Sequence, residues 1–531
     1  MLRSTFGAFT TAQLALRASQ RALDLTGHNI ANINTQGYTR QNLDLVSLHM
    51  GGSDRYASSN DVKAGHGVLI AGVSQIRDPF LDKRFRTEMA NVGEQDQKAG
   101  ILSDLEDIFD EVAKTGLENQ MIDLKNKLQN LSSQVGNKEF DSMVKSSAEV
   151  LTKLFNQYAK QVGSVRAEYE QNISDTELSG VNDIIKNIQN LNKTIKNCQV
   201  SGDPALELLD ERNQLIDELS SYIPIEVKYK PVKISSDDTI EELSINFVSA
   251  DGTKYSIIND DKAGSLNVTK NADGKMVLGL TTSDGNAVAA PPGSLGINDM
   301  LSAGSLKASL DMLNGEGEFD TTTASAPRGI AYYEKMLDSL ANTFATQFNE
   351  ANNLTAGSHD LDLFATNDGS AVITAKNISI AKGWASNEYG ITATKTDDPV
   401  DGTPVDPDSG EAAKPGQNEN ILHMISLLSE KLEYKNDAGT VIFKGSFQEC
   451  FSNAATVLGL DIKSTNALLK NYVSVATEIN NSRDAISGVS LDEEGVNILK
   501  YQKSLTAASR LMTALDEALD TIINRMGVVG R

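Results

Sequence analysis

Both ends of the chain carry apolar residues that recur at every seventh position. Near the N-terminus the side chains in one row of this repeat are large. Those in the companion row, three positions further on, are mostly small. A sustained heptad repeat predicts helices that pack along one another as in a coiled coil, and small residues allow close approach. Ordinary amphipathic helices buried in a core are the alternative. The N-terminal rows are Leu2, Phe9, Leu16, Leu23 and Ile30, with Thr5, Ala12, Ser19, Thr26 and Ile33; the C-terminal rows are Leu491, Ile498, Leu505, Met512, Leu519 and Met526, with Tyr501, Ala508, Leu515 and Ile522.

The C-terminal repeat predicts a helix over residues 491–526. Ser490 and Glu493 have the spacing of a capping box, in which each side chain satisfies a backbone N–H at a helix start. Gly527 suits the position just beyond the helix end.

The stretch TGHNIANINTQGYTRQ, residues 26–41, interrupts the N-terminal repeat. Asparagine side chains compete for backbone hydrogen bonds and therefore favour helix ends and turns. Gly37 can adopt the positive φ that a tight reversal needs. We predict that the first helix ends here and that an extended segment follows, with Asn29, Asn32, Gly37 and Tyr38 as the hinge.

Residues 64–86 indicate a strand and then the start of a helix, and helical periodicity continues from about 88 to 221. Asp203 and Pro204 suit the N-cap and the first position of the last helix in this run.

Alternating apolar residues indicate strands from about residue 223. Helical periodicity returns over 301–353 and again from 418 to the end, on either side of a mixed segment that ends in an acidic loop with prolines at 396–417. Asp–Gly pairs predict hairpin turns at 251–252, 273–274 and 284–285.

These patterns predict a mainly α chain with inserted β domains, elongated and folded back on itself. The N- and C-terminal helices would form a coiled-coil-like terminal domain at one end, a helical bundle would form the shaft, and the β domains would lie at the other end. The predicted divisions are the terminal assembly domain at 1–45 and 490–531, the helical shaft at 46–228, 301–355 and 418–489, a small all-β insertion at 229–300, and a second insertion at 356–417.

The chain is acidic, with 48 lysines and arginines against 72 aspartates and glutamates and a formal net charge of −24. Such a chain repels phosphate backbones, and no stripe of basic residues interspersed with aromatic residues offsets this, so no nucleic-acid binding is expected.

No run reaches the ~18 apolar residues of a membrane span, and the N-terminus lacks the pattern of a secretory signal peptide. We therefore expect no membrane insertion. Cys198 and Cys450 are far apart in the sequence and are expected to be free thiols.

No residue pattern indicates catalysis, a metal or a cofactor. The five histidines lack i, i+4 spacing, so no metal site is predicted. SMVK at 142–145 and KTG at 114–116 stand in the reverse of the order found in penicillin-binding enzymes, and no SDN accompanies them. Asp406, Asp408 and Glu411 lack EF-hand spacing, so a solvated loop is preferred to a calcium site.

The hinge sequence carries a family resemblance. NIANINTQGYTRQ, residues 29–41, resembles the N-terminal signature of the bacterial flagellar rod, hook and hook-associated proteins, and residues 65–86 and 487–525 are similar to two further segments of that family. LLDERNQLIDELSSYIPIEV at 208–227 is most similar to the members that join hook to filament. The resemblance covers roughly residues 1–230 and 418–531. Gln36 and Gly495 depart from it, where proline and alanine are usual.

The resemblance implies a non-enzymatic structural subunit, of which a ring of copies joins the flagellar hook to the filament. Implied partners are hook protein, the second hook–filament junction protein, other copies of the chain, the type III export apparatus, and an export chaperone on the C-terminal helix. The chain would be cytoplasmic before export and extracellular afterwards. A hook or rod subunit is the nearest alternative, and a secreted enzyme on a flagellar scaffold is a more distant one. The expected assembly residues are Leu2, Phe9, Leu16, Leu23, Ile30, Leu491, Ile498, Leu505, Met512, Leu515, Leu519 and Ile522.

Overall fold

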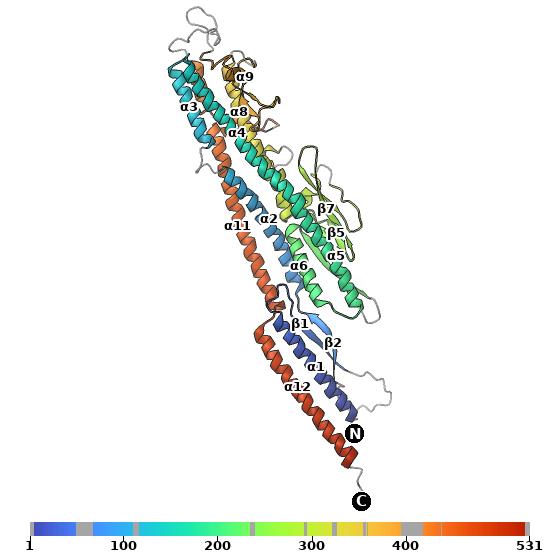
Figure 1. The fold of residues 1–531 in the computed structure, drawn as a ribbon. Helices are drawn as coiled ribbons and strands as arrows, with labels where there is room; N and C mark the ends of the chain where they lie inside the picture. The colour runs from blue at the N-terminus through green and yellow to red at the C-terminus, as the bar shows by residue number, and fades with distance from the viewer. Residues whose placement is uncertain are drawn as a thin grey trace, which may run out of the picture.

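The molecule is elongated, and both ends of the chain lie at the same tip (Figure 1). Most of its elements are helices, and its sheets are small and antiparallel, which confirms the prediction of a mainly α chain with inserted β structure. The coiled-coil geometry of the tip and the division into domains stay predictions. The computed structural model describes residues 5–48, 67–109, 116–233, 239–290, 295–320, 326–353, 357, 359–394, 418–436 and 438–525.

Three layers form the tip that holds both termini. Helix α1 (Thr5–Ala31) lies between α12 (Leu491–Asp520) and an antiparallel hairpin of β1 (Gln41–Ser47) and β2 (Val68–Gln75) (Figure 1). A π-helical turn, η4 (Thr521–Arg525), continues α12. The first helix therefore ends within the stretch that the asparagines predicted.

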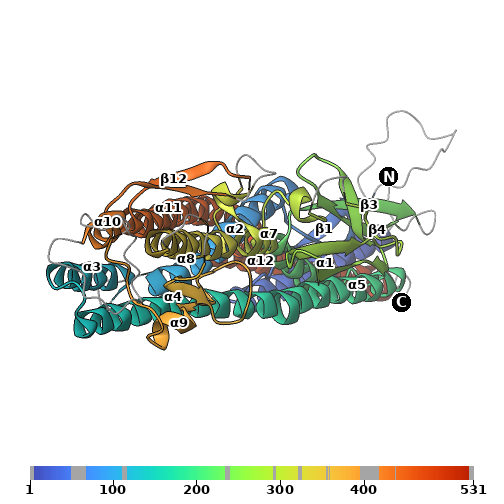
Figure 2. The same cartoon turned by 90° about the horizontal axis from the view of Figure 1, so that it is seen from above.

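Long helices form the shaft. The most extensive contact joins α2 (Pro79–Phe109) to α11 (Phe447–Ser487). Helix α4 (Lys138–Asn172) passes through a π-helical turn, η1 (Ile173–Glu177), directly into α5. Seen from above, α8 lies between α4 and α11 (Figure 2). The other shaft helices are α3 (Leu117–Ser133), α5 (Leu178–Val200), α6 (Leu206–Tyr222), α7 (Ser305–Asn314), α8 (Ile330–Asn352) and α10 (Glu419–Leu427), with short 3-10 turns η2 (Asn298–Met300) and η3 (Gly317–Phe319).

Aromatic side chains from four helices meet at the centre of the shaft. The ring of Phe109 on α2 lies 5.4 Å from Tyr333, 5.9 Å from Phe451 and 6.2 Å from Tyr158, measured between centroids. Each of these rings is buried. Aromatic pairs at such separations add to the stability that area burial already supplies, so segments far apart in the sequence share one core.

The β insertion packs against the side of the shaft. Leu243, Ile245 and Phe247 alternate inward from β4, as predicted, and the side-chain amide of Asn182 on α5 donates to the backbone carbonyl of Leu266 at 2.9 Å. The sheets therefore lie beside the middle of the molecule (Figure 1), and the prediction that they occupy the end opposite the termini is wrong. The strands are β3 (Ile225–Lys233), β4 (Thr239–Val248), β5 (Lys254–Asn259) and β6 (Lys262–Ala263) in one sheet, and β7 (Ser265–Lys270) with β8 (Met276–Thr281) in another.

The predicted Asp–Gly turns are present, each with its glycine in the left-handed region. Gly252 joins β4 to β5, Gly274 joins β7 to β8, and Gly285 follows β8, with φ of 84°, 76° and 82°. Only glycine adopts such φ values without a steric cost.

Two local predictions are wrong. Helix α6 begins at Leu206 rather than at Pro204, because Ala205 has φ of 53° and the Asp203 carboxylate accepts the Ala205 N–H at 3.0 Å. The segment after 418, expected to be helical throughout, contains a hairpin of β11 (Leu432–Lys435) and β12 (Val441–Gly445). Its apolar runs are too short for periodicity to separate a strand from a helix.

Buried asparagines on α8 attach the segment that follows this helix. The side-chain oxygen of Asn349 accepts the N–H groups of Leu363 and Phe364 at 2.9 and 2.8 Å, and its amide donates to the Phe364 carbonyl at 2.8 Å. Asn352 binds the backbone of Thr392 at 2.7 Å in the same manner. The segment attached in this way contains β9 (Phe364–Thr366), β10 (Ile378–Ile380) and the short helix α9 (Lys382–Ala385).

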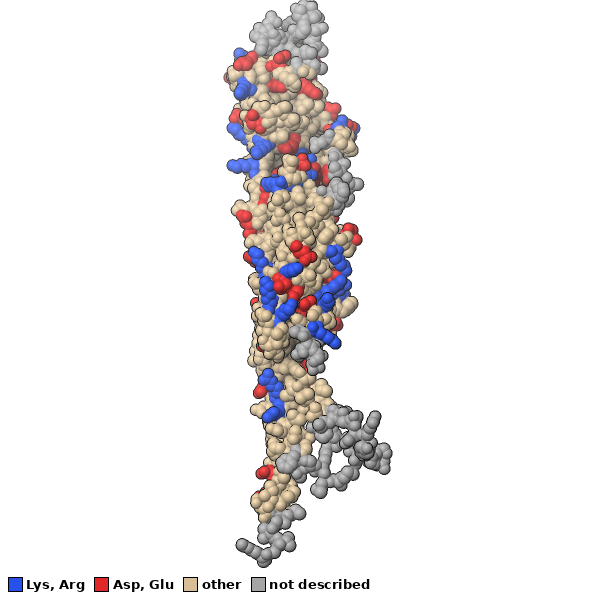
Figure 3. Space-filling model, turned by 90° about the vertical axis from the view of Figure 1, so that its right-hand side faces the viewer, with Lys and Arg blue, Asp and Glu red and all other residues tan. Residues whose placement is uncertain are grey.

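Among the described residues, no helix combines the length and the apolar content that crossing a bilayer requires. Positive and negative side chains are mixed on the middle of the face seen in Figure 3, whereas the tip with the termini shows few charges there.

Candidate assembly site

The contact between α1 and α12 is formed by the small residues of the repeat. Ala12, Ser19 and Thr26 on α1 and Ala508 on α12 are buried, and the hydroxyl oxygens of Ser19 and Ser504 lie 3.0 Å apart. Small side chains allow helix axes to approach closely. The two terminal repeats therefore meet within one chain.

The large residues of the predicted assembly set flank this contact. Leu491 and Ile522 are exposed, at 58% and 48%. Leu2 lies outside the described residues. The members of this set are only partly covered within one chain, and their role in assembly stays a prediction. The half-buried members are Phe9, Leu16, Leu23, Ile30, Ile498, Leu505, Met512, Leu515 and Leu519.

The hinge residues close a small polar network where α1 ends. The Asn29 amide donates to the Gln41 carbonyl at 3.0 Å, and its oxygen accepts the Gln41 N–H at 3.1 Å and the Tyr38 hydroxyl at 2.8 Å. Asn32 donates to the backbone carbonyl of His28 at 3.1 Å, and Gly37 has φ of 78°. The structure thus brings all four predicted hinge residues together.

Arg40 connects three segments at the joint between the tip and the shaft. Its N–H donates to the Ser487 carbonyl at the end of α11 at 2.8 Å, and its carbonyl accepts the Ile76 N–H at 3.0 Å. Its guanidinium donates to the buried Glu494 at 2.8 Å and also to Glu493, both in the first turn of α12. Two nitrogens of the guanidinium each donate to a different carboxylate. Charge-assisted hydrogen bonds of this kind are both favourable and directional.

This use of Glu493 corrects the predicted capping box. The Ser490 hydroxyl accepts the Glu493 N–H at 3.5 Å, but the Glu493 carboxylate binds Arg40 instead of capping the Ser490 backbone. A complete capping box occurs at the start of α11, between Ser446 and Glu449.

Alternating charges continue from the joint into the shaft. Arg483 on α11 binds Asp82 at 2.9 Å and Asp217 at 2.7 Å; Arg77 also binds Asp82, and Arg86 also binds Asp217, each at 2.7 Å. Burial alone would raise the pKa of Asp82, but the hydrogen bond and charge of Arg77, with the charges of Arg483 and Arg86, hold that pKa below its ordinary value. These pairs fasten α2, α6 and α11 to one another.

Asp210 on α6 receives the segment that leaves the hinge. Its carboxylate accepts the Thr39 N–H at 2.9 Å and the Thr39 hydroxyl at 2.6 Å. Burial raises the pKa of Asp210, and the two bonds from Thr39 oppose that shift. The charged residues of this joint were not predicted as site residues, because most of their partners, unlike Asp82 for Arg77, lie more than a hundred positions away in the sequence.

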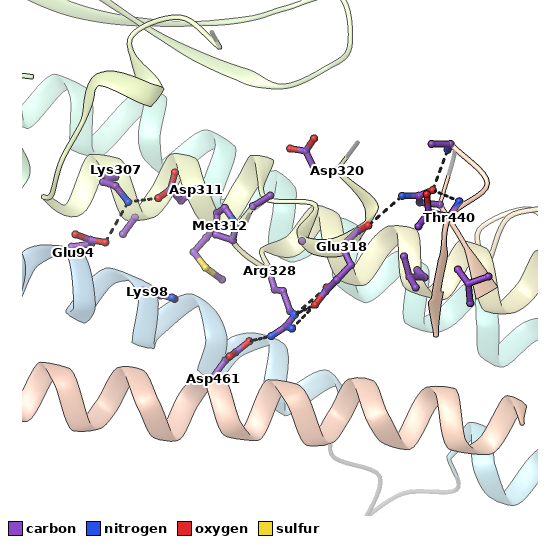
Figure 4. Close-up of a pocket in the computed structure, with 18 residues that line it drawn as sticks. Glu94, Lys98, Lys307, Asp311, Met312, Glu318, Asp320, Arg328, Thr440 and Asp461 are labelled. Atoms are coloured by element: carbon purple, nitrogen blue, oxygen red, sulfur yellow. Dashed lines mark hydrogen bonds and ion pairs between the residues drawn. The ribbon is translucent and has the colours of Figure 1, made fainter. Parts of the chain in front are cut away.

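A cleft of about 930 Å³ lies elsewhere, between α2, α7, α11 and the β11–β12 hairpin. Two of the cations that line it are paired with its own acids: Arg328 with Glu318 and Asp461, and Lys307 with Asp311 (Figure 4). No group of acidic, histidine or cysteine side chains among the described residues could hold a metal ion.

Comparison with known proteins finds similarity to flagellar hook-associated proteins. The model of the flagellar hook-associated protein FlgK helical domain matches residues 102–364. The flagellar hook-associated protein 1 of Bacillus subtilis (strain 168) is 28% identical over 546 aligned residues, which cover 100% of both chains. The chain is therefore similar to the flagellar hook-associated protein 1 of Bacillus subtilis along its whole length, and its middle matches the hook-associated helical domain.

Two further family models match the ends of the chain. That of flagella basal body rod protein matches residues 9–39, and that of the flagellar basal body rod FlgEFG protein C-terminal region matches residues 483–526. These are α1 with the hinge and α12 with the end of α11. The terminal helix pair and the hinge are thus the parts that these two flagellar rod-protein models match.

Two more distant comparisons agree. The Escherichia coli (strain K12) flagellar hook-associated protein 1 is 23% identical over 573 aligned residues, 97% of this chain and 98% of that protein. The structure of the flagellar hook junction protein FlgK from Burkholderia pseudomallei superposes with a TM-score of 0.55 at 12% identity, covering 76% of this chain and all of that one. The latter supports the fold alone.

Proposed function

We propose that this chain is a non-enzymatic subunit of the junction between flagellar hook and filament, and that it assembles through α1 and α12. The observation that carries the proposal is the pairing of the two chain ends at one tip, beneath a shaft that matches the hook-associated helical domain. The relatives are named hook-associated proteins, and the matched solved structure is named a hook junction protein.

Assembly would proceed by packing of terminal helix pairs from neighbouring copies into a ring. The half-buried large residues of α1 and α12 would be covered by neighbours, and each would add roughly 25 cal/mol for every Å² of apolar area removed from water. The tip would face hook protein and other copies, and a further surface would receive the second hook–filament junction protein. We propose the division into terminal, shaft and inserted domains on the same basis.

Before assembly, the chain would pass from the cytoplasm through the type III export apparatus to the extracellular flagellum. Helix α12 exposes apolar side chains along much of its length, and an export chaperone on this helix would keep them from water. A hook or rod subunit is the nearest alternative, but the long helical middle favours the junction.

A deletion strain tests the proposal directly. Electron micrographs should show complete hooks without filaments, with flagellin shed into the medium, and a plasmid copy should restore the filaments. Filaments of ordinary number on the deletion strain would overturn the proposed function. Absence of hooks would indicate a rod or hook subunit instead.

A further inference from the structure

The distal half of the β1–β2 hairpin exposes aliphatic side chains on both of its faces. Leu45 pairs with Ile70 and Val46 pairs with Leu69 across the two strands, and successive residues of a strand point to opposite faces. All four side chains are between 37% and 54% exposed. The hairpin stands alone as a two-stranded sheet, so both of its strands are also edges, which readily receive another chain.

A second exposed apolar patch lies on the opposite side of α1. Leu491, Val496 and Leu499, in the first turns of α12, are 58–64% exposed. Helix α1 contacts both α12 and the hairpin and separates them (Figure 1). Each copy of the tip therefore carries one apolar patch on each flank.

We propose that the hairpin of one copy packs against the start of α12 in the next copy. This inference rests on the proposed function, since it names the contact by which neighbouring junction subunits join. When copies stand side by side, each with its layers in the order hairpin, α1 and α12, the hairpin patch of one copy meets the α12 patch of the next. Such a heterologous contact is the kind that generates rings and helical arrays. The first turn of α12 is acidic, with Asp492, Glu493 and Glu494, but few charges lie on the face of the tip that holds the hairpin (Figure 3), so the hairpin brings little like charge to it.

The two patches are too small for a stable dimer. They suit an assembly in which each copy contacts a neighbour on either flank. Seven half-exposed aliphatic side chains offer on the order of 500 Å² of apolar surface, which is below the ~1,200 Å² of a stable pairwise interface. A single pair would therefore dissociate in dilute solution. Within a ring each copy has a neighbour on either flank, and the joint contacts reinforce one another.

Disulfide trapping in assembled flagella identifies the contact. Flagella are isolated from deletion strains that produce the chain with Val46→Cys and Val496→Cys together, or with either alone, and are treated with a mild oxidant. The proposal expects a ladder of crosslinked multimers for the double variant and monomer for each single variant. The native Cys198 and Cys450 are half-buried and buried, and the unsubstituted chain controls for them. Dimers from Val46→Cys alone would show a hairpin–hairpin contact and would overturn the proposal, as would monomer from the double variant.

A charge variant with a matched control separates this contact from the function itself. Val46→Asp should reduce the number of filaments about tenfold without changing the melting temperature of the purified chain. Val372→Asp places the same charge at a similarly exposed position outside the tip, and should leave filament number unchanged. If Val46→Asp filaments are normal, the contact is refuted while the proposed function stands. A lower melting temperature for Val46→Asp would show that the chain covers the hairpin itself, and would also overturn the proposal.

Discussion

Replacing Glu177 by glutamine should stabilise the shaft in neutral and alkaline solution but not in acid. Glu177 ends the π-helical turn between α4 and α5 and is 8% exposed. Its carboxylate oxygens lie 3.0 and 3.1 Å from the Ser309 hydroxyl on α7. Burial raises the pKa of Glu177 from 4.5 to about 7, and the hydrogen bond from Ser309 opposes the shift only in part.

The sign of the effect follows from the direction of that shift. Below pH 4.5 both the folded and the unfolded chain hold the proton, so the group contributes no penalty. Between pH 4.5 and 7 the unfolded chain releases the proton while the folded chain keeps it, and stability falls as the pH rises. Above pH 7 the group is ionised in both states and the loss of stability is complete. For a pKa raised from 4.5 to about 7, that loss is about 3 kcal/mol of unfolding free energy.

Urea unfolding followed by far-UV circular dichroism at pH 5, 6.5 and 8 measures this difference. Glutamine keeps the shape and a hydrogen-bonding oxygen but does not titrate, so Glu177→Gln should exceed the parent chain by less than about 1 kcal/mol at pH 5 and by about 3 kcal/mol at pH 8. Glu211→Gln, at an exposed position of α6, controls for the loss of one negative charge. A stability difference between Glu177→Gln and the parent that is the same at all three pH values would refute the reasoning.

Three further predictions concern the joint, the second insertion and the terminal helices. Arg40→Gln should leave the buried Glu494 unpaired and loosen the joint by about 3 kcal/mol, seen as faster protease cleavage between α11 and α12; equal cleavage in the exposed control Arg21→Gln would contradict this. Asn349→Ala should lower the free energy of unfolding by roughly 2–4 kcal/mol, because backbone groups of the following segment lose buried partners; an unchanged urea midpoint would contradict it. Leu505→Asp with Met512→Asp should keep the melting temperature of the shaft but abolish filament attachment, so normal motility would exclude α12 from assembly.

The sequence predicts what local periodicity and turn chemistry determine. The heptad rows identify α1 and α12, Gly37 marks the reversal at the hinge, and Asp251–Gly252 marks a hairpin, because each signal lies within a few residues of its effect. The family resemblance of residues 29–41 came from the same kind of local signal. The apolar face exposed by the β1–β2 hairpin was missed, because alternation shows that a strand has an apolar face but not whether another element covers it.

The joint could not be predicted because its contacts join distant segments. Thr39 binds Asp210 across 171 positions, and Arg40 binds Glu494 across 454. In a chain with 72 carboxylates, no single acid stands out as the partner of a given arginine. The Ser490–Glu493 spacing predicted a local cap, and the long-range bond of Glu493 to Arg40 replaced half of it.

The tip and the joint divide two physical tasks between them. Apolar contacts such as those of the small-residue row in α1 and α12 are favourable but non-directional, so they bring helices together without fixing the angle at which the shaft leaves the tip. Hydrogen bonds and ion pairs are directional, and Arg40 uses its N–H, its carbonyl and its guanidinium on three different segments at once. A subunit that passes from a dispersed chain to an ordered array needs both properties. We expect changes at Arg40 or Asp210 to alter the angle between tip and shaft, and changes along α12 to alter whether copies associate at all.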